Sequence, residues 1–117
     1  KKIVDFCKKN RIPVICFPRG IKKNYLEFAD VVKPDCLSLD YETDPTWARN
    51  SLSNYCLQGG PDPQILFKEE DEMYKEVDKY LNIFKDHPYI FNLGHGLLPE
   101  TNPEVLQKII ERVNNFK

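Results

Sequence analysis

Four short apolar runs in this sequence are each followed by a residue that could bind or act on a ligand. These residues are Arg19, Asp40, Gln58 and His95. Guanidinium and imidazole groups donate hydrogen bonds to anions, a carboxylate accepts them, and an amide does both. In parallel βα folds, ligands bind at the carboxyl ends of the strands. We therefore expect these side chains to gather at one end of the fold, with His95 facing an open cavity.

A structural role competes with a functional one at each position. Arg19 could be a solvated loop cation, which is the favoured interpretation from the residue alone. Asp40 ends an apolar run, where carboxylates cap turns about as often as they contact ligands. Gln58 precedes two glycines that could simply form a turn with positive φ. The glycines on both sides of His95 leave its imidazole little local packing, so a functional role is favoured there.

The elements that must position these residues alternate between short strands and helices. Strands are expected at residues 13–17, 36–40, 55–58 and 89–93. The strongest helical pattern covers 69–84, where apolar residues recur every three or four positions behind an acidic, solvated first turn. Further helices are expected after the N-cap Asp44 with its Pro45, and after a capping box at 101–104. His87 follows the long helix and is given a structural role, facing the negative end of that helix.

This alternation predicts an α/β fold of four consecutive βα units in one domain, 1–117, without an internal boundary. Such units form either a small open parallel sheet or half of a closed (β/α)8 TIM-type barrel. Within 36–40, Leu37 and Leu39 would face the helices while Ser38 and Asp40 face inward. A barrel mouth tolerates inward polar residues better than a covered sheet does, so the barrel is favoured.

Composition excludes several classes of protein. The 117 residues are 41% hydrophobic with a mean hydropathy of -0.54, and no apolar run approaches the roughly 20 residues of a membrane span. A net charge of -1 offers no basic field for nucleic acid. The four cysteines lack C-x2-C pairing, so we expect reduced, mostly buried thiols and a cytoplasmic location. The length suits one domain, but an opening at Lys1 with a helix already under way predicts an excerpt of a longer chain.

Three segments together resemble uroporphyrinogen decarboxylases. Residues 92–99, Asn-Leu-Gly-His-Gly-Leu-Leu-Pro, resemble that family's Asn-Leu-Gly-His-Gly signature and the proline that follows it. Residues 57–63, Leu-Gln-Gly-Gly-Pro-Asp-Pro, resemble its Gln-Gly-Asn-Leu-Asp-Pro loop, and 37–41, Leu-Ser-Leu-Asp-Tyr, resemble its strand that ends in Asp and an aromatic. The spacing between the segments also matches, so the resemblance covers nearly the whole chain as the C-terminal half of a barrel.

Gly60 and Pro61 depart from this resemblance, because the family usually has Asn-Leu at these positions. The change removes an amide side chain and stiffens the turn. Related cobamide methyltransferases have a similar fold and bind zinc through a His-x-Cys strand end. Residues 14–17, Val-Ile-Cys-Phe, lack that histidine, so no metal site is expected.

The resemblance implies a lyase that converts the four acetate arms of uroporphyrinogen III to methyls, giving coproporphyrinogen III without a cofactor. It implies a tetrapyrrole substrate and a homodimeric full-length enzyme, with no nucleic-acid or membrane partner. The carboxylate that binds the pyrrole NH groups and most carboxylate-binding arginines belong to the family's N-terminal half. No catalytic residue is therefore assigned in this chain. His95 is carried over as a substrate-binding residue, with Arg19, Asp40 and Gln58 as weaker candidates.

Two alternatives stay open beside the decarboxylase. A corrinoid or cobamide methyltransferase-like barrel would carry bound zinc. A non-enzymatic half-barrel module would show the same periodicity, and it would be a folded monomer with its own ligand. A decarboxylase fragment, in contrast, is expected to be inactive alone and to associate through its apolar strand edges.

Overall fold

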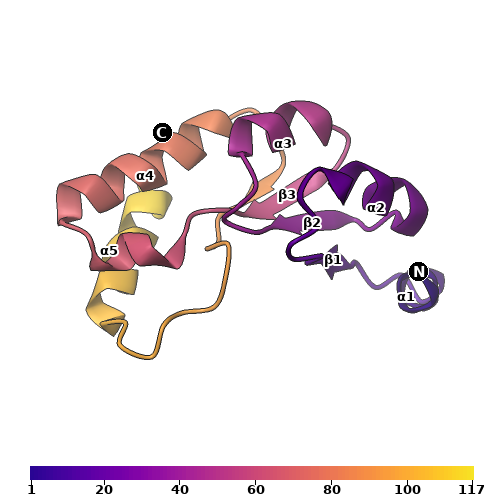
Figure 1. Cartoon of the computed structure of the whole chain (residues 1–117), viewed down its shortest axis with the longest axis horizontal. Helices are drawn as coiled ribbons and strands as arrows, with labels where there is room; N and C mark the ends of the chain where they lie inside the picture. The colour runs from indigo at the N-terminus through magenta and orange to yellow at the C-terminus, as the bar shows by residue number, and fades with distance from the viewer.

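The computed structural model describes residues 1–117 as an α/β fold built on one four-stranded sheet (Figure 1). The elements follow one another as α1 (Lys2–Lys9), β1 (Ile15–Cys16), η1 (Lys22–Asn24), α2 (Tyr25–Val32), β2 (Cys36–Leu39), α3 (Pro45–Ser51), β3 (Cys56–Gly59), η2 (Pro63–Phe67), α4 (Glu70–Ile83), β4 (Tyr89–Ile90) and α5 (Pro103–Asn114).

All four strands are parallel and lie in the order β1-β2-β3-β4, which confirms the predicted topology. The register pairs Ile15 with Cys36, Cys36 with Cys56, and Leu57 with Tyr89. Right-handed βα crossovers between neighbouring strands leave few other arrangements. The carboxyl ends of the strands therefore meet on one side of the sheet.

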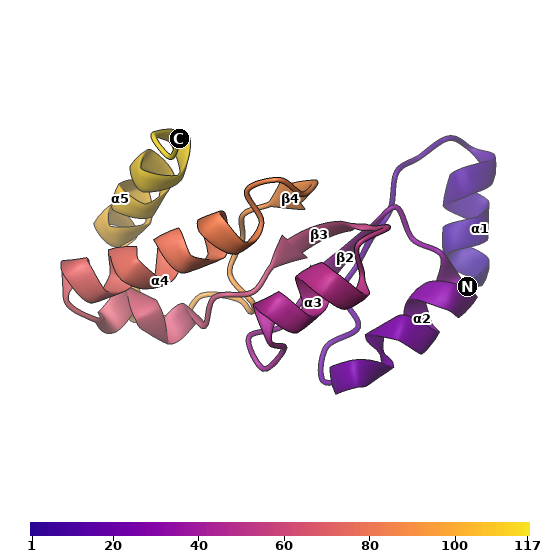
Figure 2. The same ribbon diagram turned by 90° about the horizontal axis from the view of Figure 1, so that it is seen from above.

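Helices α2, α3 and α4 cover one face of the sheet in a row, and the opposite face lies on the concave underside of the molecule (Figures 1 and 2). Leu37 and Leu39 of β2 are buried against these helices, together with Tyr25 and Phe84. Ser38, between them in the strand, faces the other way and lines the concave side. The predicted alternation is thus confirmed for residues 37–39, whereas Asp40, predicted to face inward with Ser38, does not line the concave side.

A second apolar cluster joins η2, α4 and α5 at the far end from α1. Met73, Val77 and Leu81 of α4 lie on one stripe and pack around Ile109 of α5 and Ile65 of η2. Helix α4 spans almost the whole predicted range of 69–84. The two chain ends consequently lie at opposite ends of a molecule with principal extents of 43 × 29 × 25 Å (Figure 2).

The two outer strands, β1 and β4, are shorter than predicted. They cover Ile15–Cys16 and Tyr89–Ile90, where the apolar runs predicted 13–17 and 89–93. Each outer strand forms backbone hydrogen bonds with one neighbour only, so its length is limited by the pairing with that neighbour. Ile15 and Ile90 are 48% and 43% exposed, and both edges of the sheet are open.

Two further sequence-based expectations are corrected. The N-cap of α5 is Asn102, whose Oδ1 accepts a hydrogen bond from the Glu104 amide at 3.0 Å, and the Thr101 hydroxyl is buried without a partner. The prediction of a capping box at 101–104 is therefore wrong, although the helix starts where expected. The four cysteines are free thiols, but only Cys36 is buried, because Cys7 lies on the outer helix α1, Cys16 on the edge strand β1 and Cys56 at the start of β3.

Candidate functional site

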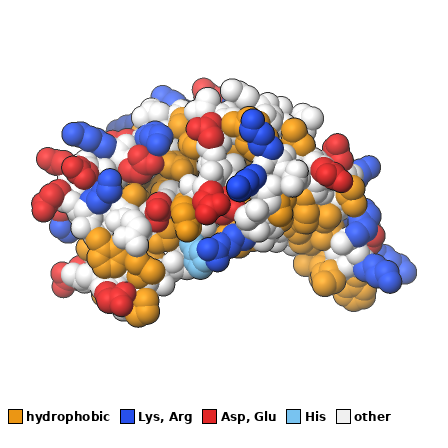
Figure 3. All heavy atoms as spheres, viewed as in Figure 1, with side chains coloured by type: hydrophobic (Ala, Val, Ile, Leu, Met, Phe, Trp, Pro, Cys, Tyr) orange, Lys and Arg blue, Asp and Glu red, His pale blue; other side chains and the backbone are white.

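A hollow of about 670 Å³ lies on the concave side of the sheet, bounded by the loop after β4 and by α5. Its volume falls within the range of small-molecule sites in proteins. The space-filling view shows the arched underside with a histidine at the hollow, adjoined in projection by a basic side chain (Figure 3). The lining is mostly apolar, with a few polar groups: Ile15, Phe17, Ser38, Gln58, Phe91, Asn92, Leu93, His95, Gly96, Leu97, Leu106, Ile109 and Ile110.

His95 is exposed to this hollow, as its Gly-His-Gly setting predicted. Its Nδ1 accepts a hydrogen bond from the Gly96 amide at 2.6 Å. A ring nitrogen that accepts carries no proton, so the neutral imidazole bears its proton on Nε2. No protein group pairs with Nε2, which leaves it able to donate to a ligand. The Tyr41 ring lies 6.5 Å from the imidazole, centre to centre, and is tilted against it.

Gln58 lines the same hollow from β3. Its Nε2 donates a hydrogen bond to the Ser38 hydroxyl at 3.2 Å, and these two residues are register partners on adjacent strands. The side-chain amide is thereby held against the sheet, with its carbonyl oxygen still free to accept. Gln58 and His95, two of the four residues singled out by sequence, are therefore brought to one cavity.

The loops after β2, β3 and β4 approach one another closely at this end of the sheet. A Cβ atom on Gly94 would lie 2.4 Å from the Tyr41 nitrogen, so only glycine allows this contact. The Gly94 amide donates to the Pro61 carbonyl at 2.8 Å. Gly59 and Gly60 have φ of +85° and +132°, as expected for a turn that needs glycine. Backbone packing of the turns thus sets where His95 emerges.

Asp40 lies at the same end of the sheet but does not line the hollow. It is only 2% exposed, and both carboxylate oxygens are occupied by the protein. Its Oδ2 accepts from the Gly20 amide and its Oδ1 from the Thr43 hydroxyl, each at 2.7 Å. The structural alternative considered for Asp40, a carboxylate capping the turn after its strand, is thus realised.

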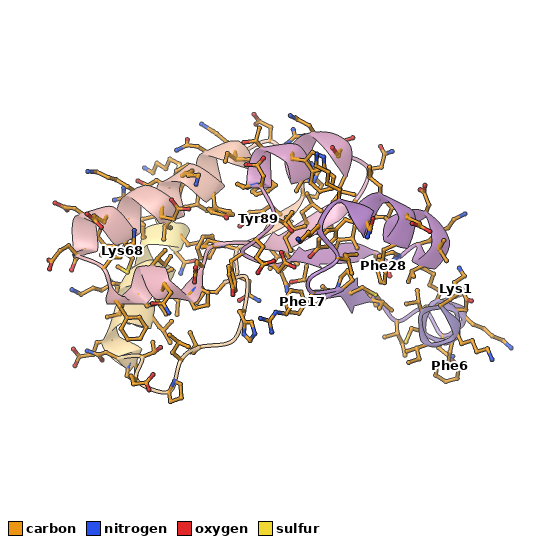
Figure 4. All side chains as sticks on the ribbon, viewed as in Figure 1. Lys1, Phe6, Phe17, Phe28, Lys68 and Tyr89 are labelled. Atoms are coloured by element: carbon orange, nitrogen blue, oxygen red, sulfur yellow. The ribbon has the colours of Figure 1, made fainter.

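Arg19 is exposed in the loop after β1 and also lies outside the lining of the hollow. Its amide donates to the Phe17 carbonyl at 3.0 Å, and its guanidinium forms no ion pair. Phe17 itself lies on the concave side (Figure 4). The expected group of four side chains is thus divided. His95 and Gln58 share the hollow, whereas Arg19 and Asp40 lie in the loops after β1 and β2, outside its lining.

Sequence reasoning missed the contribution of α5 to the hollow. Leu106, Ile109 and Ile110 form part of its wall. These residues recur at helical spacing and so could be recognised as an apolar face, but the pattern does not say what that face covers. Phe91 and Asn92 were expected in a strand, whereas they lie in the loop that leads to His95.

His87 has a structural role, as predicted, but with a different partner. Its Nε2 lies 2.9 Å from the Tyr55 carbonyl oxygen, and its ring packs near Phe84. Burial lowers the pKa of His87, and Arg49 adds to this effect, while the hydrogen bond to Tyr55 opposes it. The imidazole joins the segment after α4 to the residue before β3, and its hydrogen bond goes to Tyr55 and not to a carbonyl of α4.

Tyrosine and cysteine groups under the helices are held in their neutral forms. Burial raises the pKa values of Tyr80 and Tyr89, and it raises the pKa of Cys36 to about 12 with a contribution from Cys56. No three His, Cys, Asp or Glu side chains come together as a set of metal ligands. None of the helices has the length and apolar character required to cross a bilayer.

Comparison with known proteins gives a consistent result. The family model described as Uroporphyrinogen decarboxylase (URO-D) matches residues 1–116. Proteins named uroporphyrinogen decarboxylase from Cereibacter sphaeroides and Paracoccus denitrificans are 34% and 37% identical over 117 and 103 residues. These alignments cover 97% and 87% of this chain, but 34% and 30% of the relatives. The chain therefore spans about a third of the length of the curated relatives that it matches.

Proposed function

Because the chain belongs to the uroporphyrinogen decarboxylase family, we propose that it is part of an enzyme that converts uroporphyrinogen III to coproporphyrinogen III. The observation that carries this proposal is the family match over residues 1–116. The hollow at the carboxyl ends of the strands supports it, because a histidine with a free donor lies there in an apolar setting. Ligands of parallel βα folds bind at this end of the sheet.

The proposed reaction removes one CO2 from each of four acetate arms. Protonation of the ring carbon beside the carbon that bears the arm makes the pyrrole cationic, so that the ring accepts the electron pair of the breaking C–C bond as CO2 leaves. Protonation of the exocyclic carbon and loss of the ring proton then restore the pyrrole and complete a methyl group. The net change at each arm exchanges CO2 for a proton, and the protein must supply that proton, orientation and complementary charge.

His95 is proposed to bind a substrate carboxylate. Its Nε2 proton can be donated to a carboxylate oxygen while the Gly96 amide holds the ring through Nδ1. Gln58, held by Ser38, would contact a second polar group in the hollow. Arg19, exposed and without an ion-pair partner, would meet a further carboxylate at the rim.

The rest of the reaction is assigned to parts of the enzyme beyond these residues. Uroporphyrinogen carries eight carboxylates, and Arg19 and His95 offer little positive field against them. We propose that the remaining two thirds of the relatives' length corresponds to the portion that supplies the proton donor, the carboxylate for the pyrrole NH groups and the other half of a (β/α)8 barrel. The complete enzyme would be a cytoplasmic homodimer that needs no cofactor.

The test is turnover of uroporphyrinogen by the protein made from the complete coding sequence, followed by chromatographic separation of the products. Coproporphyrinogen should accumulate, and the 117-residue chain alone should match a buffer blank. Turnover by the isolated chain, or a complete protein that holds stoichiometric zinc and transfers methyl groups instead, would refute the assignment.

A variant of the active protein tests His95. His95→Ala should lower kcat/KM by about tenfold to a hundredfold or change which arm reacts first, because one charge-assisted hydrogen bond is lost. His87→Gln is the matched control, since His87 lies outside the hollow, and it should leave the product pattern unchanged. If His95→Ala were less stable but kept normal turnover and product pattern, the histidine would have only a structural role in its turn.

A further inference from the structure

Asp40 is a buried carboxylate without a cationic partner. It is 2% exposed and takes part in no ion pair. Burying an unpaired charge costs free energy unless hydrogen bonds compensate it, and here the Gly20 amide and the Thr43 hydroxyl do so. The bond to Thr43 is local, as in an ordinary turn cap. The bond to Gly20 reaches 20 residues along the chain, into the loop after the neighbouring strand.

That loop carries Arg19. The Phe17 carbonyl accepts the Arg19 amide, and the next residue, Gly20, is the one anchored to Asp40. The guanidinium itself forms no ion pair, and the residue is exposed. Two amide donors fix this loop, Arg19 to the Phe17 carbonyl and Gly20 to the Asp40 carboxylate, and Ile21 packs against the core beside them. Of the two hydrogen bonds, only the one to Asp40 ties the loop to a neighbouring strand end.

The backbone of Asp40 is held by a further hydrogen bond. The Asp40 amide donates to the Tyr25 hydroxyl at 3.2 Å, and Tyr25, the first residue of α2, is fully buried. The residue after Asp40, Tyr41, is in backbone contact with Gly94, which leads directly to His95. The Asp40–Tyr41 segment thus lies between the loop that bears Arg19 and the loop that bears His95.

We propose that Asp40 is a positioning residue that holds Arg19 at a set place relative to His95 and does not itself touch the substrate. This inference rests on the proposed function, in which Arg19 and His95 both meet substrate carboxylates. It gives Asp40 a role different from that of a substrate-binding residue, for which the sequence made it a weaker candidate. Two carboxylate-binding groups on separate loops need such a tie, because misplacement of one by about 1 Å is costly for orientation.

The first test needs no substrate and uses hydrogen exchange of the full-length protein. Gly20 is exposed, so its amide should exchange fast unless Asp40 holds it. We expect protection of at least about tenfold, and its loss in Asp40→Asn, because a carboxamide is a weaker acceptor than a carboxylate. An unprotected Gly20 amide in the unaltered chain would overturn the proposal without any variant.

Asp44 provides a matched control, because it lies four residues after Asp40 in the loop that follows β2. Asp44→Ala removes the exposed N-cap of α3, whose Oδ1 accepts the Trp47 amide at 2.6 Å. It should loosen Trp47 and leave the protection of Gly20 unchanged. Equal loss of Gly20 protection in both variants would show general loosening of the loop and would contradict a specific tie.

The second test uses the active full-length enzyme and a double-mutant cycle. Asp40→Asn should raise KM for uroporphyrinogen about tenfold with less than about threefold change in kcat, and Arg19→Ala should do the same. The double variant should be no worse than Arg19→Ala, because Asp40 acts through Arg19. If the increases in KM of the two single variants multiplied in the double variant, the proposal would be overturned. The control Asp44→Ala should leave KM unchanged. Were the full-length protein inactive, the proposed function would fail, while the exchange of Gly20 would still decide whether Asp40 holds that loop.

Discussion

At Gly60, a left-handed backbone conformation and close packing against a buried ring both restrict the chain. Its φ is +132°, and a Cβ atom there would lie 2.3 Å from Cε1 of Tyr80. The Tyr80 ring therefore occupies the space in which the asparagine of the resembling family motif would begin. The departure at Gly60 is accompanied by a tyrosine on α4 that fills the gap, so this turn packs onto α4 rather than presenting an amide.

Gly60→Ala should destabilise the chain by about 2–4 kcal/mol, because backbone strain and overlap with a buried ring add together. Two other glycines separate these causes in denaturant unfolding. Gly20→Ala, with φ of +78° in open space, should cost about 1 kcal/mol, and Gly96→Ala, with no atom within 4 Å, should be close to neutral. Equal losses at Gly60 and Gly20 would mean that the Tyr80 contact carries no weight.

His87 should make stability depend on pH in a defined direction. Because its folded pKa is below the ordinary value of about 6.5, the unfolded chain binds the proton more readily than the folded one. The contribution of His87 is therefore largest above the unfolded pKa, and it declines as pH falls toward the folded pKa. His87→Gln should remove this part of the decline between about pH 7 and pH 5, as measured by unfolding at several pH values. Parallel pH profiles for the two proteins would contradict this.

At the scale of elements, α5 shows how one residue decides where a helix is capped. Asn102 caps it, with Pro103 in the first turn, while Thr101 stands outside with a buried, unpaired hydroxyl. Asn102→Ala should therefore cost about 1 kcal/mol of stability. Thr101→Val should be neutral or slightly stabilising, because it removes a buried polar atom that has no partner. A capping box centred on Thr101 requires the opposite order of the two losses in thermal unfolding.

Ion pairs on the outer surface also connect α5 to α4. Arg112 contacts Asp78 through two hydrogen bonds and lies over the Tyr74 ring, 5.1 Å from its centre. Lys108 pairs with Glu70 one turn earlier. Asp78 and Arg112 shift each other's pKa values, lowering that of Asp78 and raising that of Arg112. These pairs are exposed, so the apolar cluster around Ile109 contributes more to docking than they do.

At the scale of the whole molecule, the open edges of the sheet are the main liability. β1 and β4 each have one unpaired side, and apolar side chains such as Ile15 are half exposed beside them. Phe6 likewise projects from α1 away from the sheet and is 66% exposed (Figure 4). Exposed apolar edges pair with other strands, so the isolated chain is expected to associate with itself.

Sedimentation of the isolated chain over a concentration series should show this association. Ile15→Lys should shift it toward monomer, because a charge on an edge strand opposes strand pairing. Leu26→Lys is the matched control: Leu26 is 45% exposed, close to the 48% of Ile15, but lies on α2. If both variants, or neither, reduced association, contact through the β1 edge would be excluded as its cause.

The sequence by itself determined the order and direction of the strands and the span of the long helix. These features follow from local patterns: apolar runs of strand length, helical spacing of apolar residues, and the N-cap at Asp44. It also indicated His95 and Gln58, because residues just after parallel strands share one end of the fold.

Only the tertiary structure decided what lies across from each residue. The extent of β1 and β4 depends on having a single neighbour, and the burial of Asp40 depends on Gly20 in another loop. The ring of Tyr80 in the space beside Gly60 is a further contact between distant segments. Periodicity reports which face of an element is apolar, whereas the partner of that face is chosen by packing among elements that the pattern does not relate to one another.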